Sequence, residues 1–219
     1  MISPKYSLSH YFFNDSRPRT KAPNVVNLYL DYNCPFSAKI FFKFLEIIPL
    51  LEKRYPGTFQ FVFVNVVQPW HPNSVLLNEF SLVVADLLRK DDPNISNEMF
   101  WIVSGSLFRN KEKFYDSATV SLGRNETYKH IYDVVQEEVE LLFDQNDILD
   151  KLYIKEETDT AKASNGGNFA TVDIKYFTRY LRTVGVHVTP TVSVNGIVND
   201  SISSGSSNEE LLKIFETYL

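Results

Sequence analysis

The sequence predicts an α/β fold with a large helical insertion. Two β-rich runs flank an apolar helical pattern near the start of the chain, and a β-rich hairpin followed by a helix closes it. Most of the residues between these two parts show helical periodicity. The chain has 219 residues and is 44% hydrophobic, which is enough for one well-buried core.

The first predicted strand and helix meet at the only cysteine of the chain. Residues 25–32 form a β-rich run, and Pro35 opens an apolar helical pattern, so Cys34 falls at or next to the helix N-cap. Free backbone N–H groups and the positive end of the helix dipole stabilise a thiolate there. We therefore expect Cys34 to be reactive or to face a ligand. The alternative is a buried cysteine that packs as a small hydrophobe.

The position three residues after Cys34 is Ser37. A second cysteine there would lie within reach across the first helical turn, and its absence means that no internal disulfide can form. Cys34 therefore acts alone, with a small-molecule thiol, or with a cysteine of another molecule. We expect the Ser37 hydroxyl to donate a hydrogen bond to the Cys34 thiolate.

A second β-rich run at residues 59–67 follows a turn. The order strand, helix, strand predicts parallel pairing with a right-handed connection. Trp70 and His71 come directly after this run, at the sheet edge where α/β ligand sites gather. We expect both to line the Cys34 site, with His71 as an acid–base group. A loop histidine with a satisfied hydrogen bond is the alternative.

The insertion is predicted to be helical. Apolar periodicity and N-cap residues predict helices at residues 74–91, 96–107, 125–142 and 172–184. A polar stretch at residues 155–168 ends in Asn-Gly-Gly-Asn and predicts a mobile loop. Gly185 follows the last of these helices, where a left-handed C-cap belongs.

The C-terminal part returns to β structure. Residues 186–194 predict a strand, Asn195-Gly196 predicts a tight hairpin to residues 197–198, and Ser207 or Asn208 caps a final helix. The expected organisation is an N-terminal extension (1–24), the first part of an α/β domain (25–72), the helical insertion (73–185) and the second part of the domain (186–219).

Charge and length exclude several classes of function. The net charge is −5 with mixed signs and no long basic run, so we expect no nucleic-acid or anionic-membrane partner. No stretch is long enough to cross a bilayer, and residues 1–21 lack the continuous apolar core of a secretory signal. One unpaired cysteine agrees with the cytoplasmic location that these features predict.

Metal binding has little support in the sequence. The four histidines show no short ligand spacing, and one cysteine cannot build a thiolate cluster. We expect no metal and no permanently bound cofactor. The sequence leaves the oligomeric state open.

Four features together resemble the thioredoxin superfamily. They are Cys34-Pro35-Phe36-Ser37 after a strand, Val188-Thr189-Pro190-Thr191, Val194-Asn195-Gly196, and the spacing that the insertion fills. The helical insertion resembles the DsbA-like branch, whose relatives include kappa-class glutathione transferases. The resemblance spans the chain from about residue 25 to its end and implies an α/β, thioredoxin-like fold with a large helical insertion.

The resemblance also implies a binding site around the thiol. Pro190 would be cis and face Cys34, and Thr189 would offer its backbone N–H and C=O to an extended ligand such as glutathione or a peptide. We expect further substrate contacts from Pro35 and from an aromatic rim of Tyr32 and Phe36. The alternative for these two aromatic residues is that they pack the helix start.

The implied function is thiol–disulfide exchange with protein thiols and disulfides. Because Ser37 replaces the second cysteine of the family pattern, an external thiol such as glutathione would act as cosubstrate and release the product. Two alternatives stay open. One is a binding module that holds a peptide or glutathione without turnover. The other is a kappa-type glutathione transferase, although that class has a serine where Cys34 stands.

Overall fold

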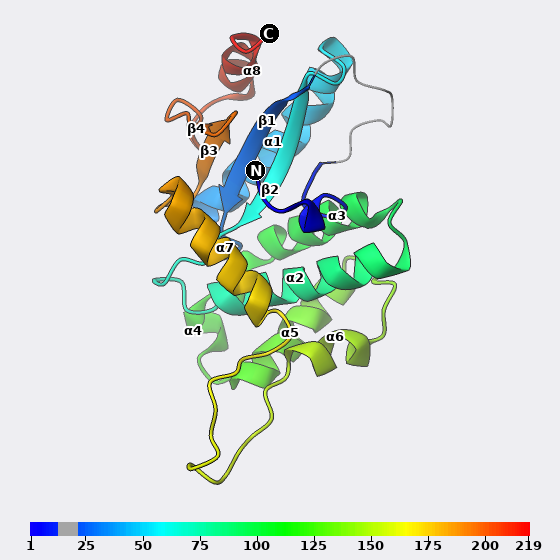
Figure 1. The fold of residues 1–219 in the computed structure, drawn as a ribbon, viewed down its shortest axis with the longest axis vertical. Coiled ribbons are helices and arrows are strands. Elements are labelled where there is room, and N and C mark those ends of the chain that lie inside the picture. Colours follow the sequence, from blue (N-terminus) through cyan, green and yellow to red (C-terminus); the bar gives the residue numbers. More distant parts are fainter. Residues whose placement is uncertain (13–21) are drawn as a thin grey trace.

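The computed structural model describes residues 1–12 and 22–219, which fold into a sheet-containing half and a helical half (Figure 1). The upper half in Figure 1 contains strands β1 to β4 with helices α1 and α8, and the lower half contains α2 to α6. Helix α7 crosses in front of the boundary between the two halves and packs on α2.

The sheet has four strands in the order β2-β1-β3-β4. Strands β1 (Asn24–Leu30) and β2 (Phe59–Asn65) pair in parallel, as the strand-helix-strand order predicts. Strands β3 (Thr191–Val194) and β4 (Ile197–Val198) add antiparallel to β1 and to each other. Leu28 of the central strand β1 pairs with β2 on one side and β3 on the other. The central position explains why β1 is buried almost throughout.

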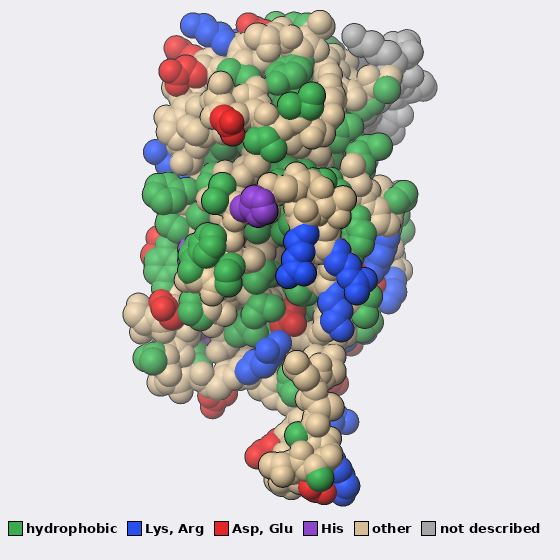
Figure 2. Space-filling model, turned by 60° about the vertical axis from the view of Figure 1, so that its left-hand side comes forward, with side chains coloured by type: hydrophobic (Ala, Val, Ile, Leu, Met, Phe, Trp, Pro, Cys, Tyr) green, Lys and Arg blue, Asp and Glu red, His purple; other side chains and the backbone are tan. Residues whose placement is uncertain are grey.

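Most helices agree with the apolar periodicity of the sequence. The helices are η1 (Pro4–Tyr6), α1 (Pro35–Arg54), α2 (Ser74–Asp91), α3 (Ser96–Arg109), η2 (Lys111–Phe114), α4 (Asp116–Thr119), α5 (Arg124–Gln136), α6 (Gln145–Leu152), α7 (Thr171–Val184) and α8 (Asn208–Glu216). Gly185 ends α7 with φ 71°, the left-handed C-cap that the sequence predicts. Figure 2 shows a group of Lys and Arg side chains on one face, at the height of α7 in Figure 1.

Two predicted elements differ from the structure. The helix expected at residues 125–142 ends at Gln136, and a separate helix, α6, begins after Asp144, whose backbone N–H is accepted by Asp147. The strand expected at residues 186–194 begins only at Thr191. Pro190 has no N–H to donate to a strand ladder, and the residues before it form a loop.

The N-terminal residues, to which the sequence analysis assigned no structure, cover an edge of the sheet. Tyr11 forms an antiparallel bridge with Val62 of β2. Hydrogen bonds of 2.8 Å run from Phe12 N to Phe61 O and from Phe63 N to His10 O. An uncovered edge strand presents unpaired backbone groups to other chains, so residues 10–12 satisfy the outer side of β2.

Candidate functional site

Cys34 is the N-cap residue of α1, as the sequence predicts. Its extended backbone (φ −88°, ψ 119°) places its carbonyl to accept the N–H of Ala38, at 3.1 Å. Pro35 follows as the first helical residue, where its missing N–H costs no hydrogen bond. The Cys34 side chain is only 4% exposed, and its thiol is the one free thiol of the chain.

The loop before β3 lies against this thiol. Cys34 Sγ donates to the carbonyl oxygen of Thr189 at 3.6 Å, and the peptide bond between Thr189 and Pro190 is cis. Gln68 holds the loop from behind, because its side-chain amide donates to His187 O at 3.2 Å and approaches Thr189 Oγ1 at 3.5 Å. The structure therefore brings together two of the four features on which the resemblance rested, the motifs that contain Cys34 and Thr189.

A buried carboxylate organises the other side of the site. Asp31 Oδ1 accepts from Asn33 N at 2.9 Å and from Ser74 Oγ at 2.7 Å. Asp31 Oδ2 accepts from His71 Nδ1 at 2.7 Å and from Gln68 N at 3.3 Å. These four donors offset the cost of burying the charge. They also tie the end of β1, the loop after β2 and the start of α2 to one point.

The structure connects His71 and Trp70 to the thiol only indirectly. His71 uses Nδ1 for Asp31, and Trp70 is 60% exposed with its ring edge-on to His71. No hydrogen bond joins either of them to Cys34 in the described part of the chain. The connection runs through Asp31, whose backbone carbonyl accepts the Cys34 N–H at 3.0 Å. The direct roles expected for His71 and Trp70 stay predictions.

Tyr32 is not part of a rim around the thiol, and that expectation was wrong. Its side chain is fully buried, with its ring stacked on Phe63 at 5.2 Å and tilted against Phe108 at 5.0 Å. Its hydroxyl hydrogen-bonds Ser104 Oγ at 2.9 Å, and burial raises the pKa of the phenol. The residue packs β2 against α3, whereas the alternative that the sequence left open was packing at the start of the helix.

Ser37 also differs from its expected role. It is fully buried, and its Oγ accepts the N–H of Asp31 at 3.3 Å. No hydrogen bond joins Ser37 to Cys34 among the described residues. The hydroxyl therefore fastens the first turn of α1 to the end of β1, and the expected hydrogen bond from Ser37 to the thiolate is absent from this structure.

Phe36 lies where a ligand contact was expected. It is 61% exposed and borders a groove of about 380 Å³ beside the loop that touches Cys34. Apolar residues such as Phe36, Val188 and Pro190 line one part of the groove, and polar residues such as Asn199 and Asp200 line another.

Sequence reasoning missed three residues of this region. Asp31 and Gln68 carry the hydrogen bonds described above. The pKa of Tyr115, after η2, is raised mainly by burial and further by its neighbours Glu112 and Cys34. An acidic residue at the end of an apolar strand was a usable signal for Asp31. Tyr115 had no comparable local signal.

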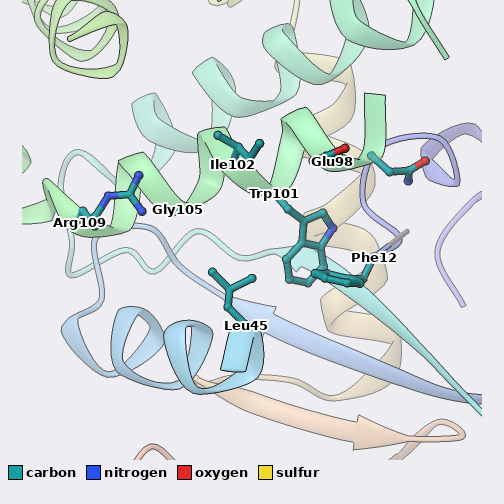
Figure 3. Close-up of a pocket in the computed structure, with 8 residues that line it drawn as sticks. Phe12, Leu45, Glu98, Trp101, Ile102, Gly105 and Arg109 are labelled. Atoms are coloured by element: carbon teal, nitrogen blue, oxygen red, sulfur yellow. The ribbon is translucent and has the colours of Figure 1, made fainter. Parts of the chain in front are cut away.

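A separate cavity of about 550 Å³ lies between α1 and α3 (Figure 3). The Trp101 and Phe12 rings meet edge to face at 5.0 Å, and Leu45 comes from α1. None of its lining residues is among those around Cys34, so it is not part of the thiol site. Within the described ranges, no group of three or more acidic, His or Cys side chains could hold a metal, and no helix has the length and apolar character of a membrane span.

The fold resembles known thiol–disulfide exchange proteins. A structure described as a candidate protein-disulfide isomerase from Pseudomonas syringae has a TM-score of 0.65 and 21% identity, covering 88% of this chain and 93% of its own. The thiol-disulfide exchange protein α-DsbA2 from Wolbachia pipientis has a TM-score of 0.60 and 16% identity, covering 96% and 87%. Oxidised BdbD from Bacillus subtilis has a TM-score of 0.52 and 17% identity, covering 99% and 96%.

These likenesses establish the fold class. The chain has the DsbA-like thioredoxin fold with a helical insertion, as the sequence resemblance implied. No family model matches the sequence, and no curated protein shows a significant match to it. At such low identities the solved structures define the architecture, and the chemistry has to be argued from the residues of this chain.

Proposed function

We propose that the protein carries out thiol–disulfide exchange through the single thiol of Cys34. The observation that carries the proposal is the placement of this thiol at the N-cap of α1, with Sγ 3.6 Å from Thr189 O in the loop before β3. A helix N-terminus favours a thiolate, and in this proposal the backbone of Thr189 pairs with an extended ligand. Pro35 and Phe36 supply apolar contacts beside it.

The exchange has two balanced steps. The Cys34 thiolate attacks one sulfur of a disulfide R–S–S–R′, a Cys34–S–S–R bond forms, and R′–S⁻ leaves and takes up a proton. Because Ser37 offers no second thiol, an external thiolate must complete the cycle. The thiolate of glutathione attacks the R sulfur, forms a glutathione–R disulfide and regenerates the Cys34 thiolate.

A binding module without turnover is the second candidate. The low exposure of the Cys34 side chain and its contact with Thr189 O favour it, because a substrate sulfur must reach Sγ before exchange can begin. In this alternative the groove beside Phe36 holds a peptide or glutathione, and the thiol contributes one contact. The two candidates differ in whether bond exchange occurs.

Turnover of a peptide–glutathione mixed disulfide separates these candidates. The wild type and Cys34→Ser are incubated with the mixed disulfide and excess glutathione, and release of the free peptide is followed. We expect catalysed release by the wild type and none above background by Cys34→Ser. Trapping of one glutathionyl group on Cys34, detected by mass spectrometry, identifies the intermediate.

The remaining outcomes of this experiment are also informative. Absence of release by the wild type, together with peptide binding that survives in Cys34→Ser, would replace the exchange proposal with the binding module. Conjugation of an electrophile to glutathione that persists in Cys34→Ser would instead indicate a transferase of the kappa type. Circular dichroism of both proteins controls for folding.

A further inference from the structure

The outer face of α7 carries three cations without partners. Lys175, Arg179 and Arg182 follow one another at helical spacings of four and three residues, so they lie on one face, and all three are exposed. Their side chains form no hydrogen bond or ion pair with any residue that the structure describes. We call these three residues the α7 stripe.

Cations on several other helices of the protein are paired with acidic residues. Arg109 pairs with Glu138 at 3.0 Å and Lys129 with Asp133 at 2.6 Å. Helix α7 has one acidic residue, Asp173, which is buried and already bound by Lys5 and Tyr6. No further acidic residue occurs before Asp200. A positive surface therefore stands out on a chain with a net charge of −5 (Figure 2).

The chain connects the α7 stripe directly to the thiol site. After Gly185 turns the backbone, the next residues lead to Thr189, whose carbonyl contacts Cys34 Sγ. Arg182 and Thr189 are seven residues apart, so at most about 25 Å of chain separates them. A ligand strand of about eight residues spans this distance. Between the two, Val188 is 60% exposed and offers an apolar contact.

We propose that the α7 stripe binds an acidic segment of the protein whose disulfide Cys34 exchanges. The identity of this partner rests on the proposed function, thiol–disulfide exchange through Cys34. A row of two guanidinium groups and one ammonium matches carboxylates spaced along a single chain, since an Arg guanidinium donates two parallel hydrogen bonds to one carboxylate. The segment lies within about eight residues of the substrate cysteine, on one side of it.

A protein segment fits this surface better than a nucleic acid does. The tyrosines on the same helix are not free platforms for bases, because Tyr176 and Tyr180 stack on each other at 6.4 Å and Tyr180 also stacks on Tyr29. The net negative charge of the chain opposes a long polyanion, whereas a short acidic segment meets only the local positive field.

The test compares two peptides and two variants. Both peptides carry one cysteine in a mixed disulfide with glutathione. About eight residues from this cysteine, the acidic peptide has a block of Asp and Glu residues. The neutral peptide has Asn and Gln at the same positions. Each triple variant replaces three unpaired, exposed cations by Gln, so both change the net charge equally. The stripe variant is K175Q/R179Q/R182Q, and the control variant is K53Q/K155Q/K213Q.

We expect the wild type and the control variant to release the acidic peptide about ten times faster than the neutral one at low salt, as a few exposed ion pairs allow. The stripe variant should treat both peptides alike, and about 0.5 M salt should remove the preference. Equal rates for both peptides in the wild type, or a preference that survives in the stripe variant, overturn the proposal.

Two further readouts keep the inference separate from the exchange chemistry. If no protein releases even the neutral peptide, the proposed function fails. Binding to the α7 stripe is then measured by fluorescence anisotropy, with an acidic peptide whose cysteine is replaced by serine. Tenfold weaker binding of this peptide to the stripe variant than to the wild type supports the proposal for the stripe. Displacement of that peptide by an oligonucleotide of equal charge at equal concentration would overturn the assignment in favour of a general polyanion site.

Discussion

Acidification should destabilise the folded protein through His10, which the interior holds neutral. His10 is fully buried, with Nε2 2.8 Å from Asn65 Oδ1 and Nδ1 2.9 Å from Ser9 Oγ. The Asn65 amide nitrogen already donates to Asn78, so its oxygen is the acceptor and His10 Nε2 carries the hydrogen. Nδ1 then accepts from the Ser9 hydroxyl, and a second proton on the ring would lose that hydrogen bond.

The size of the effect follows from linkage. Burial lowers the pKa of His10 from 6.5 to about 3, and the nearby charges of Arg89 and Lys5 act in the same direction. Between these two values the unfolded chain binds more protons than the folded one. Stability is therefore complete above the unfolded value and is lost as the pH falls toward the folded one. At pH 5 the loss amounts to about 2 kcal/mol of unfolding free energy relative to pH 8.

Urea unfolding at pH 8 and pH 5 measures this loss, with His10→Phe as the comparison. The His10 ring stacks against Phe100 at 4.4 Å and Phe177 at 5.4 Å, so Phe keeps the packing and removes the titration. All other groups titrate in both proteins, and the difference between the two pH dependences isolates His10. His10→Gln is a second variant that retains hydrogen bonding. Identical pH dependences in the wild type and both variants would refute the reasoning.

Two further substitutions test other parts of the structure. Ser37→Cys places a second thiol one helical turn from Cys34, so release of a bound peptide should no longer need glutathione; unchanged dependence on glutathione would count against the exchange mechanism. Gly185→Ala should cost about 1 kcal/mol in urea unfolding, because the residue has φ 71° and an added Cβ meets no atom within 4 Å; no change would contradict the backbone argument.

Local signals explain why most of the fold could be predicted. Strand β1, helix α1 and strand β2 each have an apolar pattern of their own, and Pro35 fixes where α1 begins. The hairpin turn was equally local, since Asn195 and Gly196 adopt φ values of 53° and 86°, the left-handed region that these residue types favour. Elements of this kind need no knowledge of what packs against them.

The failed boundaries depend on tertiary contacts. Val139 and Leu141 are buried although they lie outside any helix. Apolar residues after Gln136 therefore made the predicted helix too long. The N-terminal residues gave no pattern, because separate contacts, such as the bridge from Tyr11 to Val62 and the hydrogen bond between His10 and Asn65, fasten them to the sheet. In both regions the residues are buried by parts of the chain that are distant in sequence. The apolar periodicity of a segment does not predict such contacts.

The same distinction applies to the site. Cys34, Thr189 and Pro190 were identified by short motifs, and the structure places them together. Tyr32 was assigned to the rim because it is close to Cys34 in sequence, yet the residue after a strand points to either face, and here it enters the core. Asp31 was missed because its four donors come from separate segments, and only the folded chain brings them to one carboxylate.

Gln68 connects the buried Asp31 carboxylate to the loop beside Cys34. Its backbone N–H donates to Asp31, and its side chain donates to the loop that presents Thr189 to the thiol. Asp31 therefore fixes the loop before β3 through its carboxylate, and it fixes Cys34 through its backbone carbonyl, which accepts the Cys34 N–H. A chain with one thiol cannot use a second cysteine to choose or release its partner. In the mechanism we propose, selection must come from rigid surfaces around Cys34, which this network holds in place.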